Sequence, residues 1–156
     1  MAEYRFLTTW LLDAPRDDVW EAIYAVERWP EWWRGIERVE KLVHGDGDGV
    51  GAVYAHRWRS VVPYPVHFRV TVEQVERPQL IVARADGELA GTGVWRLYDG
   101  HGTGVTYDWQ VRTTRRWMNL VAPVARPVFA WNHHAVMRRG GEGLAELLGA
   151  HLLARS

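Results

Sequence analysis

The chain has 156 residues, which suits one domain with a buried core, and its 19 basic and 19 acidic residues give zero net charge. This balance gives no sign of nucleic-acid binding, and no apolar run nears the roughly 20 residues that span a bilayer. Cysteine is absent, so disulfides and thiolate chemistry are excluded. The N-terminus lacks the pattern of a signal peptide. We expect a single soluble, cytoplasmic domain over residues 1–156, with neither a nucleic-acid partner nor integral membrane insertion.

The first part of the chain predicts one strand and two short helices. Residues 5–12 are rich in Phe, Leu, Thr and Trp, which favours a strand. A helix is expected over residues 16–26, because Pro15 suits a first helical turn and apolar residues recur after it at steps of three and four. A second short helix is expected to begin at residues 28–33, with Pro30 separating the two.

From residue 36 onward the pattern predicts six strands. They are expected over residues 36–43, 52–60, 66–76, 79–85, 89–98 and 105–114. Glycine-rich turns join several of them, and two prolines within residues 61–65 interrupt the chain between the second and third. Connections of hairpin length favour an antiparallel sheet.

The end of the chain predicts a long helix. Pro123 and Pro127 place its start near residues 126–128, and its stripe is expected to run to Leu153. That stripe comprises Phe129, Asn132, His133, Val136, Gly140, Gly143, Leu144, Leu147 and His151. One helix can cover one face of a sheet, so the sheet should curl around it in an α+β fold. Polar groups and glycines at such an interface indicate a lined cavity rather than a solid core.

Alternation along the strands predicts which side chains face this cavity. The expected lining from the sheet is Tyr54, His56, Trp58, Phe68, Trp95, Tyr107 and Trp109, closed by Phe129, Asn132 and His133 of the helix. Gly91 and Gly93 share a face with Trp95 and leave part of that face without side chains. This gap allows either close packing or space for a ligand. The buried His, Asn and Tyr groups need partners, supplied by a ligand, by water or by the core itself. The ten tryptophans fit either an aromatic pocket or an indole-rich core.

The sequence lacks the patterns that metal binding, phosphate binding and a serine nucleophile require. His133 and His134 point about 100° apart on a helix, and no His–carboxylate spacing suggests zinc. The glycine-rich segments lack the context of a phosphate-binding loop, and neither serine suits a nucleophile elbow. Asp46 and Asp48 are explained by turn formation rather than by calcium. We therefore expect no metal and no cofactor.

Motifs across nearly the whole chain resemble the polyketide cyclase/dehydrase and lipid-transport family of the START-like (SRPBCC), helix-grip superfamily. They are Asp13-Ala14-Pro15 with Val19-Trp20, Trp29-Pro30-Glu31-Trp32-Trp33, Tyr54-Ala55-His56-Arg57-Trp58, Pro63-Tyr64, Gly87-Glu88-Leu89-Ala90-Gly91, Val94-Trp95, Trp117-Met118, Pro123, Arg126-Pro127, Phe129, Trp131-Asn132-His133, Met137, Gly140 and Gly143-Leu144. The C-terminal run is the more specific part and resembles a bacterial branch. The resemblance implies a curved antiparallel sheet of about seven strands wrapped around a long C-terminal helix, two short helices after strand 1, and a hydrophobic cavity between sheet and helix.

Three functions are consistent with these residues. The first is binding of a small hydrophobic, aromatic or polyketide-like ligand, with Asn132, His133 and His56 orienting its polar group and tryptophans forming the walls. The alternative is a polyketide cyclase, aromatase or dehydratase, in which His133 or His56 is the acid/base and Tyr107 or Arg57 polarises a carbonyl. The third is a cavity-poor interaction module that uses the Trp29–Trp33 surface, although these tryptophans also suit sealing the end of the sheet. A homodimer is a further expectation.

Overall fold

The computed structural model describes residues 3–59, 65–114 and 116–156. In chain order the elements are β1 (Glu3–Leu12), α1 (Arg16–Tyr24), a 3-10 turn η1 (Val26–Arg28), α2 (Trp29–Trp32), β2 (Ile36–Val43), β3 (Val53–Trp58), β4 (Val66–Glu76), β5 (Leu80–Gly87), β6 (Leu89–Gly100), β7 (Gly102–Thr113), α3 (Arg116–Leu148) and β8 (Leu152–Arg155). The predicted interruption at residues 61–65 and the Pro63-Tyr64 motif fall largely outside the described residues.

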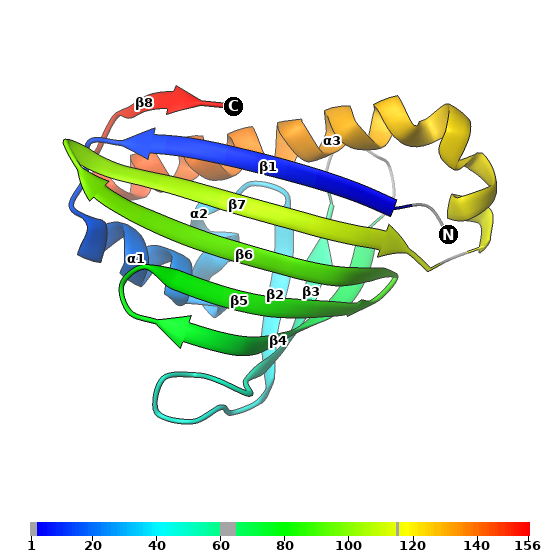
Figure 1. Cartoon of the computed structure of the whole chain (residues 1–156), viewed down its shortest axis with the longest axis horizontal. Helices are drawn as coiled ribbons and strands as arrows, with labels where there is room; N and C mark the ends of the chain where they lie inside the picture. The colour runs from blue at the N-terminus through cyan, green and yellow to red at the C-terminus, as the bar shows by residue number, and fades with distance from the viewer. Residues whose placement is uncertain (1–2, 60–64, 115) are drawn as a thin grey trace.

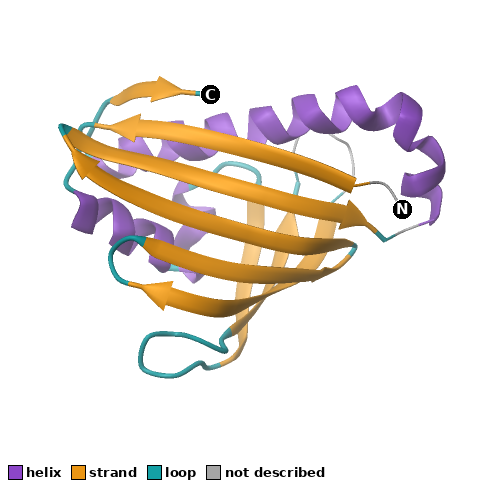
Figure 2. Cartoon of the chain, viewed as in Figure 1, coloured by secondary structure: helices purple, strands orange, loops and turns teal. Residues whose placement is uncertain are grey.

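The strands form one antiparallel sheet in the order β2-β3-β4-β5-β6-β7-β1-β8. The sheet is strongly curved, and the three α-helices lie on its concave side, with α3 running along it (Figures 1 and 2). The α+β architecture expected from the strand and helix patterns is therefore confirmed, with an eighth strand added. Within the described residues, no helix is both long and apolar enough to cross a membrane.

The tryptophans after α1 pack into the core between the sheet and α3. Trp29 and Trp33 are 5% and 1% exposed, and the Trp33 indole Nε1–H donates to the Val136 carbonyl at 2.9 Å. A β-carbon on Gly140 would overlap the Trp33 ring, and one on Gly143 would overlap the Trp32 carbonyl oxygen. These two glycines therefore allow α2 and its tryptophans to pack closely against α3, and they do not provide space for a ligand. The alternative in which the Trp29–Trp33 segment forms an exposed interaction surface is not supported, because two of its three tryptophans are buried.

The start of α3 differs from the prediction. The helix begins at Arg116, about ten residues before the expected start, and contains Pro123 and Pro127 in its interior. Both prolines are exposed and lie four residues apart, so they share one face, where water can bond the carbonyls that each proline leaves without an N–H donor. The first turns of α3 bend away from the axis of the rest, as internal prolines cause (Figure 1).

The end of α3 also differs from the prediction. The helix ends at Leu148, and Gly149 follows with φ +61°, the left-handed conformation that glycine supplies after a helix. His151 lies beyond the helix, where its Nδ1 is 2.9 Å from Asp13 Oδ2, and the next residues pair with β1 as strand β8. The expected helical stripe is therefore five residues too long, and His151 does not lie on the helix.

The turn between β2 and β3 is held by its aspartate. Asp46 Oδ1 accepts hydrogen bonds from the backbone N–H groups of Asp48 and Val50, at 2.9 and 3.0 Å. Turn formation therefore accounts for Asp46, as the sequence indicates.

Candidate ligand-binding site

Two adjoining cavities lie between the sheet and α3. The outer cavity, of about 130 Å³, is lined by Tyr4, Phe6, Trp58, Val66, Phe68, Leu89, Trp109, Val111, Thr113, Phe129, Asn132, His133 and Val136. The inner cavity, of about 60 Å³, is lined by Ile23, Val26, Trp29, Tyr54, His56, Trp58, Phe68, Val70, Val72, Ile81, Ala83, Gly93, Trp95, Tyr107, Trp109, His133 and Met137. Among these described residues neither lining contains Asp, Glu, Lys or Arg.

A partition of four side chains separates the two cavities. Trp58, Phe68, Trp109 and His133 border both. Three strands and α3 supply them, so side-chain rotation at the partition would join the two spaces. The partition is aromatic throughout, which makes the combined site a slot for flat, apolar groups.

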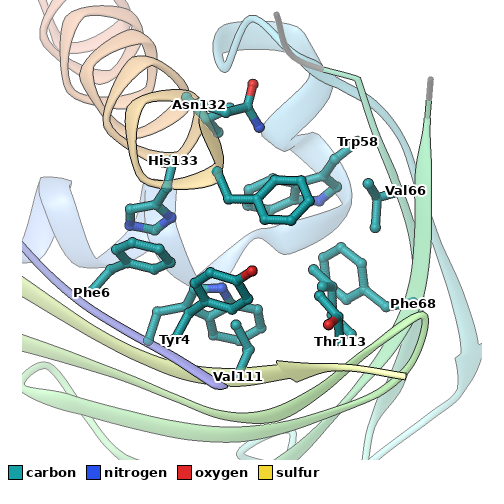
Figure 3. A pocket seen from close by; sticks show the side chains of 13 residues that line it. Tyr4, Phe6, Trp58, Val66, Phe68, Val111, Thr113, Asn132 and His133 are labelled. Carbon is teal, nitrogen blue, oxygen red and sulfur yellow. The ribbon is translucent and has the colours of Figure 1, made fainter. Parts of the chain in front are cut away.

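His133 enters the outer cavity from α3 and lies flat on Phe6. Figure 3 shows the two rings lying against each other; their centroids are 4.1 Å apart and their interplanar angle is 16°. The His133 Nε2 atom is buried and has no hydrogen-bond partner among the described residues. Burial, and then the neighbouring His134, lower the pKa of His133 to about 3. The imidazole is therefore neutral at physiological pH.

His56 is held in one tautomer at the inner cavity. The Trp58 indole Nε1–H, which can only donate, points at His56 Nδ1 at 3.0 Å. His56 Nδ1 must accept this bond, so in the neutral ring the proton resides on Nε2. Burial lowers the pKa of His56 to about 3, which keeps the ring neutral. The Nε2–H group is buried without a partner in the described part of the chain, and so presents a fixed donor at the inner cavity.

Tyr107 lies deep in the inner cavity. Its ring stacks on Trp95 with centroids 4.1 Å apart, and burial raises the pKa of its hydroxyl. A β-carbon on Gly93 would lie 2.7 Å from that hydroxyl oxygen, so Gly93 makes room for the tyrosine. Tyr107 therefore stays protonated and packs against β6.

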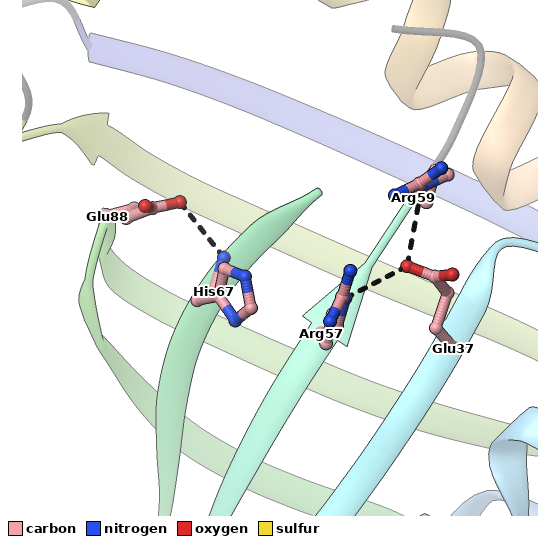
Figure 4. Close-up of polar contacts among 5 residues, drawn as sticks. All are labelled: Glu37, Arg57, Arg59, His67 and Glu88. Atoms are coloured by element: carbon pink, nitrogen blue, oxygen red, sulfur yellow. Dashed lines mark hydrogen bonds and ion pairs between the residues drawn. The ribbon is translucent and has the colours of Figure 1, made fainter. Parts of the chain in front are cut away.

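Two predicted site residues lie away from both cavities. Arg57 alternates with His56 along β3 and points to the outer face, where its Nε is 3.1 Å from Glu37 Oε1 (Figure 4). Gly91 lines a surface depression beside β1 and β7, and a β-carbon there would overlap the Gln110 carbonyl oxygen. Arg57 thus cannot polarise a carbonyl in the cavity, and Gly91 serves close packing of neighbouring strands.

The structure brings the other predicted side chains together as alternation indicates. The outer cavity collects Trp58, Phe68, Trp109, Phe129, Asn132 and His133, and the inner cavity collects Tyr54, His56, Gly93, Trp95 and Tyr107. Figure 3 shows His133, Tyr4 and Phe68 facing one space from three different elements.

Sequence reasoning missed the contribution of β1. Tyr4 and Phe6 line the outer cavity, and the Tyr4 hydroxyl is buried without a partner among the described residues. Burial raises the pKa of Tyr4, although Arg126, whose guanidinium carbon lies 4.7 Å from the centre of its ring, opposes this. The period-two sequence Tyr4-x-Phe6-x-Thr8-x-Trp10 carried the signal, since it places aromatic groups on one strand face.

Comparison with known proteins shows which family shares this architecture. Residues 12–138 match the family described as polyketide cyclase / dehydrase and lipid transport. No curated protein matches the sequence.

Several solved structures share the fold at low identity. The di-domain ARO/CYC BexL from the BE-7585A biosynthetic pathway is 17% identical, with a TM-score of 0.75 over 96% of this chain and 51% of its own, so this chain spans about half of that protein. The Zhui aromatase/cyclase from Streptomyces sp. R1128 is 18% identical, with a TM-score of 0.67 over 94% and 96% of the two chains. A START superfamily protein from Mycobacterium smegmatis is 11% identical, with a TM-score of 0.71 over 93% and 98%.

The family match spans most of the chain, and the sheet, the helix and the cavity between them agree with it. The protein belongs to the polyketide cyclase/dehydrase and lipid transport family and has START-like structural neighbours.

Proposed function

We propose that the protein binds a small hydrophobic, aromatic or polyketide-like molecule in the outer cavity, with a polar group of that molecule reaching the inner one. The observation that carries this proposal is a lining with no charged side chain among the described residues, in which the buried atoms His56 Nε2, His133 Nε2 and Tyr4 Oη have no hydrogen-bond partner in that part of the chain. Burying such polar atoms unpaired costs free energy, and a ligand that bonds them recovers it.

The cavity dimensions and the His56 donor narrow the ligand class. A volume of about 130 Å³ is close to that of engineered apolar cavities, about 150 Å³, that hold benzene. The inner cavity, at about 60 Å³, suits a smaller group such as a carbonyl. Because His56 presents Nε2–H and not a lone pair, the group that meets it must be an acceptor. A single ring bearing a carbonyl combines both features.

A matched pair of ligands tests this proposal. Acetophenone and α-methylstyrene have nearly the same shape, because a methylene group replaces the carbonyl oxygen, but only acetophenone carries a hydrogen-bond acceptor. We expect saturable chemical-shift changes with both in a protein NMR titration, with acetophenone binding about tenfold more tightly because of one hydrogen bond. The His56→Phe variant should bind the two ligands equally.

Arg57→Gln is the matched control, since it alters the neighbouring residue on the opposite face of β3 and should preserve the preference for acetophenone. Thermal unfolding of both variants verifies that they are folded. Failure of the wild-type protein to bind either ligand saturably would refute the proposal.

Cyclisation, aromatisation or dehydration of a polyketide is the second candidate. It is supported by the likeness to the BexL and Zhui structures and by His133 and Tyr4, which place titratable groups in the outer cavity. The pKa of His133, about 3, disfavours it, because a general base works best with a pKa near the operating pH. Turnover of a poly-β-keto substrate by the wild-type protein, lost in His133→Ala, would favour this candidate over simple binding.

A further inference from the structure

The first half of α3 exposes a continuous apolar stripe. It consists of Trp117, Leu120, Val124, Val128 and Trp131, which are 44%, 82%, 84%, 50% and 60% exposed. Their spacing of three, four, four and three residues places them on one face of the helix. We call these five residues the α3 stripe. A surface helix normally turns its apolar face inward, so an outward stripe that includes two tryptophans marks an interaction surface.

The α3 stripe is distinct from the cavity. Phe129, Asn132 and His133 of the same helical turns line the outer cavity, and none of the five stripe residues lines either cavity. The first half of α3 therefore has two apolar faces, one toward the ligand site and one toward the surroundings.

Charge along the chain is segregated around this helix. Residues 109–141 contain six arginines and no Asp or Glu, which leaves 13 basic residues against 19 acidic ones elsewhere. The even overall balance therefore conceals a basic segment. Arg112, Arg116 and Arg138 are exposed, and no carboxylate of the described residues forms an ion pair with any of them. Arg126 is also exposed and donates to the Glu3 carbonyl at 2.8 Å.

The exposed apolar stripe and the basic segment together indicate which kind of partner this surface would bind. Arg138 lies seven residues after Trp131, on the same face of α3, and Arg116 adjoins Trp117 at the other end of the stripe. In a symmetric dimer formed through the α3 stripe, these arginines of both copies would be brought close to one another, which is unfavourable. An anionic bilayer supplies apolar depth for Leu120 and Val124 and negative charge for the arginines. Tryptophans favour the boundary between lipid headgroups and acyl chains, which suits Trp117 and Trp131. We propose that the α3 stripe docks the protein peripherally on anionic lipid membranes.

Docking in this way would bring the outer cavity close to the lipid surface. Val128 of the stripe and Phe129 of the cavity are adjacent residues, so the distance between membrane and cavity is about the width of one helix. An apolar ligand could then pass between bilayer and cavity with little exposure to water. The docking itself does not depend on which ligand the cavity holds.

Vesicle cosedimentation tests the docking. We expect the wild-type protein to sediment with vesicles of equimolar phosphatidylglycerol and phosphatidylcholine, and to remain in solution with vesicles of phosphatidylcholine alone. Raising the salt from roughly 0.1 M to 0.5 M should weaken binding, because salt screens surface charges. Leu120→Ser combined with Val124→Ser should lower the partition coefficient at least about tenfold, because two apolar side chains no longer enter the lipid. Arg116→Gln with Arg138→Gln should weaken binding to the anionic vesicles only.

The chain offers a matched control on β2, an edge strand of the sheet. Leu42 and Val43 of β2 are also an exposed Leu–Val pair, 44% and 50% exposed, and their replacement by Ser should leave vesicle binding unchanged. Equal binding to neutral and anionic vesicles, or none to either, would overturn the proposal. So would light scattering that shows a wild-type dimer converted to a monomer by the Leu120→Ser, Val124→Ser pair, since the stripe would then join two copies. Acetophenone binding by the same variants reports separately on the cavity.

Discussion

At the residue scale, the Trp58–His56 hydrogen bond decides the chemistry of the inner cavity. An indole N–H can only donate, so it fixes the acceptor at His56 Nδ1 and the proton at Nε2. A histidine whose lone pair is already engaged, and whose pKa lies at about 3, is a hydrogen-bond donor and not a base at neutral pH. This is why the site suits recognition of an acceptor more than proton abstraction.

The tautomer of His56 can be measured directly. In wild-type protein at neutral pH, the ¹⁵N shifts of the His56 ring should be those of a single Nε2–H tautomer. Trp58→Phe removes the donor to Nδ1, so the two tautomers should then interconvert and give averaged shifts. His133 provides an internal reference, since Trp58 donates no hydrogen bond to it. Unchanged His56 shifts in the variant would show that the indole does not set the tautomer.

At the element scale, glycines let α3 approach α2 closely. Glycine inside a helix costs about 1 kcal/mol relative to alanine, so propensity alone favours replacing Gly143. A β-carbon at Gly143, however, would overlap the backbone oxygen of Trp32, and backbone atoms yield little. Steric overlap therefore outweighs propensity at this position.

We expect Gly143→Ala to lower the free energy of unfolding by about 2 kcal/mol, the scale of overpacking a filled core. Gly47 is the matched control, because a β-carbon there meets nothing within 4 Å and its φ is not positive. Gly47→Ala should leave stability unchanged or raise it slightly. Urea titrations measure both variants, and a stabilised Gly143→Ala would show that α2 and α3 move apart without cost.

At the scale of the whole molecule, the buried neutral histidines couple stability to pH. Burial holds the pKa of both His56 and His133 at about 3, against an ordinary value of 6.5. Between these values the unfolded chain binds protons that the folded chain does not. Stability is therefore fully present above about pH 6.5 and falls as the pH drops toward 3.

Each histidine should contribute up to about 1.4 kcal/mol of lost stability per pH unit within this window. The His133→Phe variant keeps a ring on Phe6 but cannot titrate, so its unfolding free energy should fall less between about pH 7 and pH 5 than that of the wild-type protein. Urea titrations at the two pH values provide the comparison. Identical pH dependence in both proteins would mean that His133 is protonated as readily in the folded state as in the unfolded one.

The local patterns of the sequence were sufficient for the strands and for the inward side chains of β3 and β4. Period-two alternation determines which face a residue occupies, so it placed Tyr54, His56 and Phe68 on the inner face, where all three side chains line the cavities. The same rule, applied to β1, would have found Tyr4 and Phe6. The prolines of α3 led to a wrong prediction of where this helix begins. The free-energy cost of a proline inside a helix depends on whether water can reach the carbonyl that loses its hydrogen bond, and the exposure of that carbonyl depends on the tertiary structure.

What the sequence by itself determined is the fold class, the order of the elements from β1 to α3 and the aromatic character of the inner face, because all three follow from hydrophobic periodicity along the chain. The tertiary structure alone decided the division into two cavities, the tautomer of His56 and the placement of Arg57 beside Glu37. It also decided that Gly140 and Gly143 admit indoles rather than ligand. Each of these depends on atoms from segments distant in sequence, whose separation only the folded chain defines.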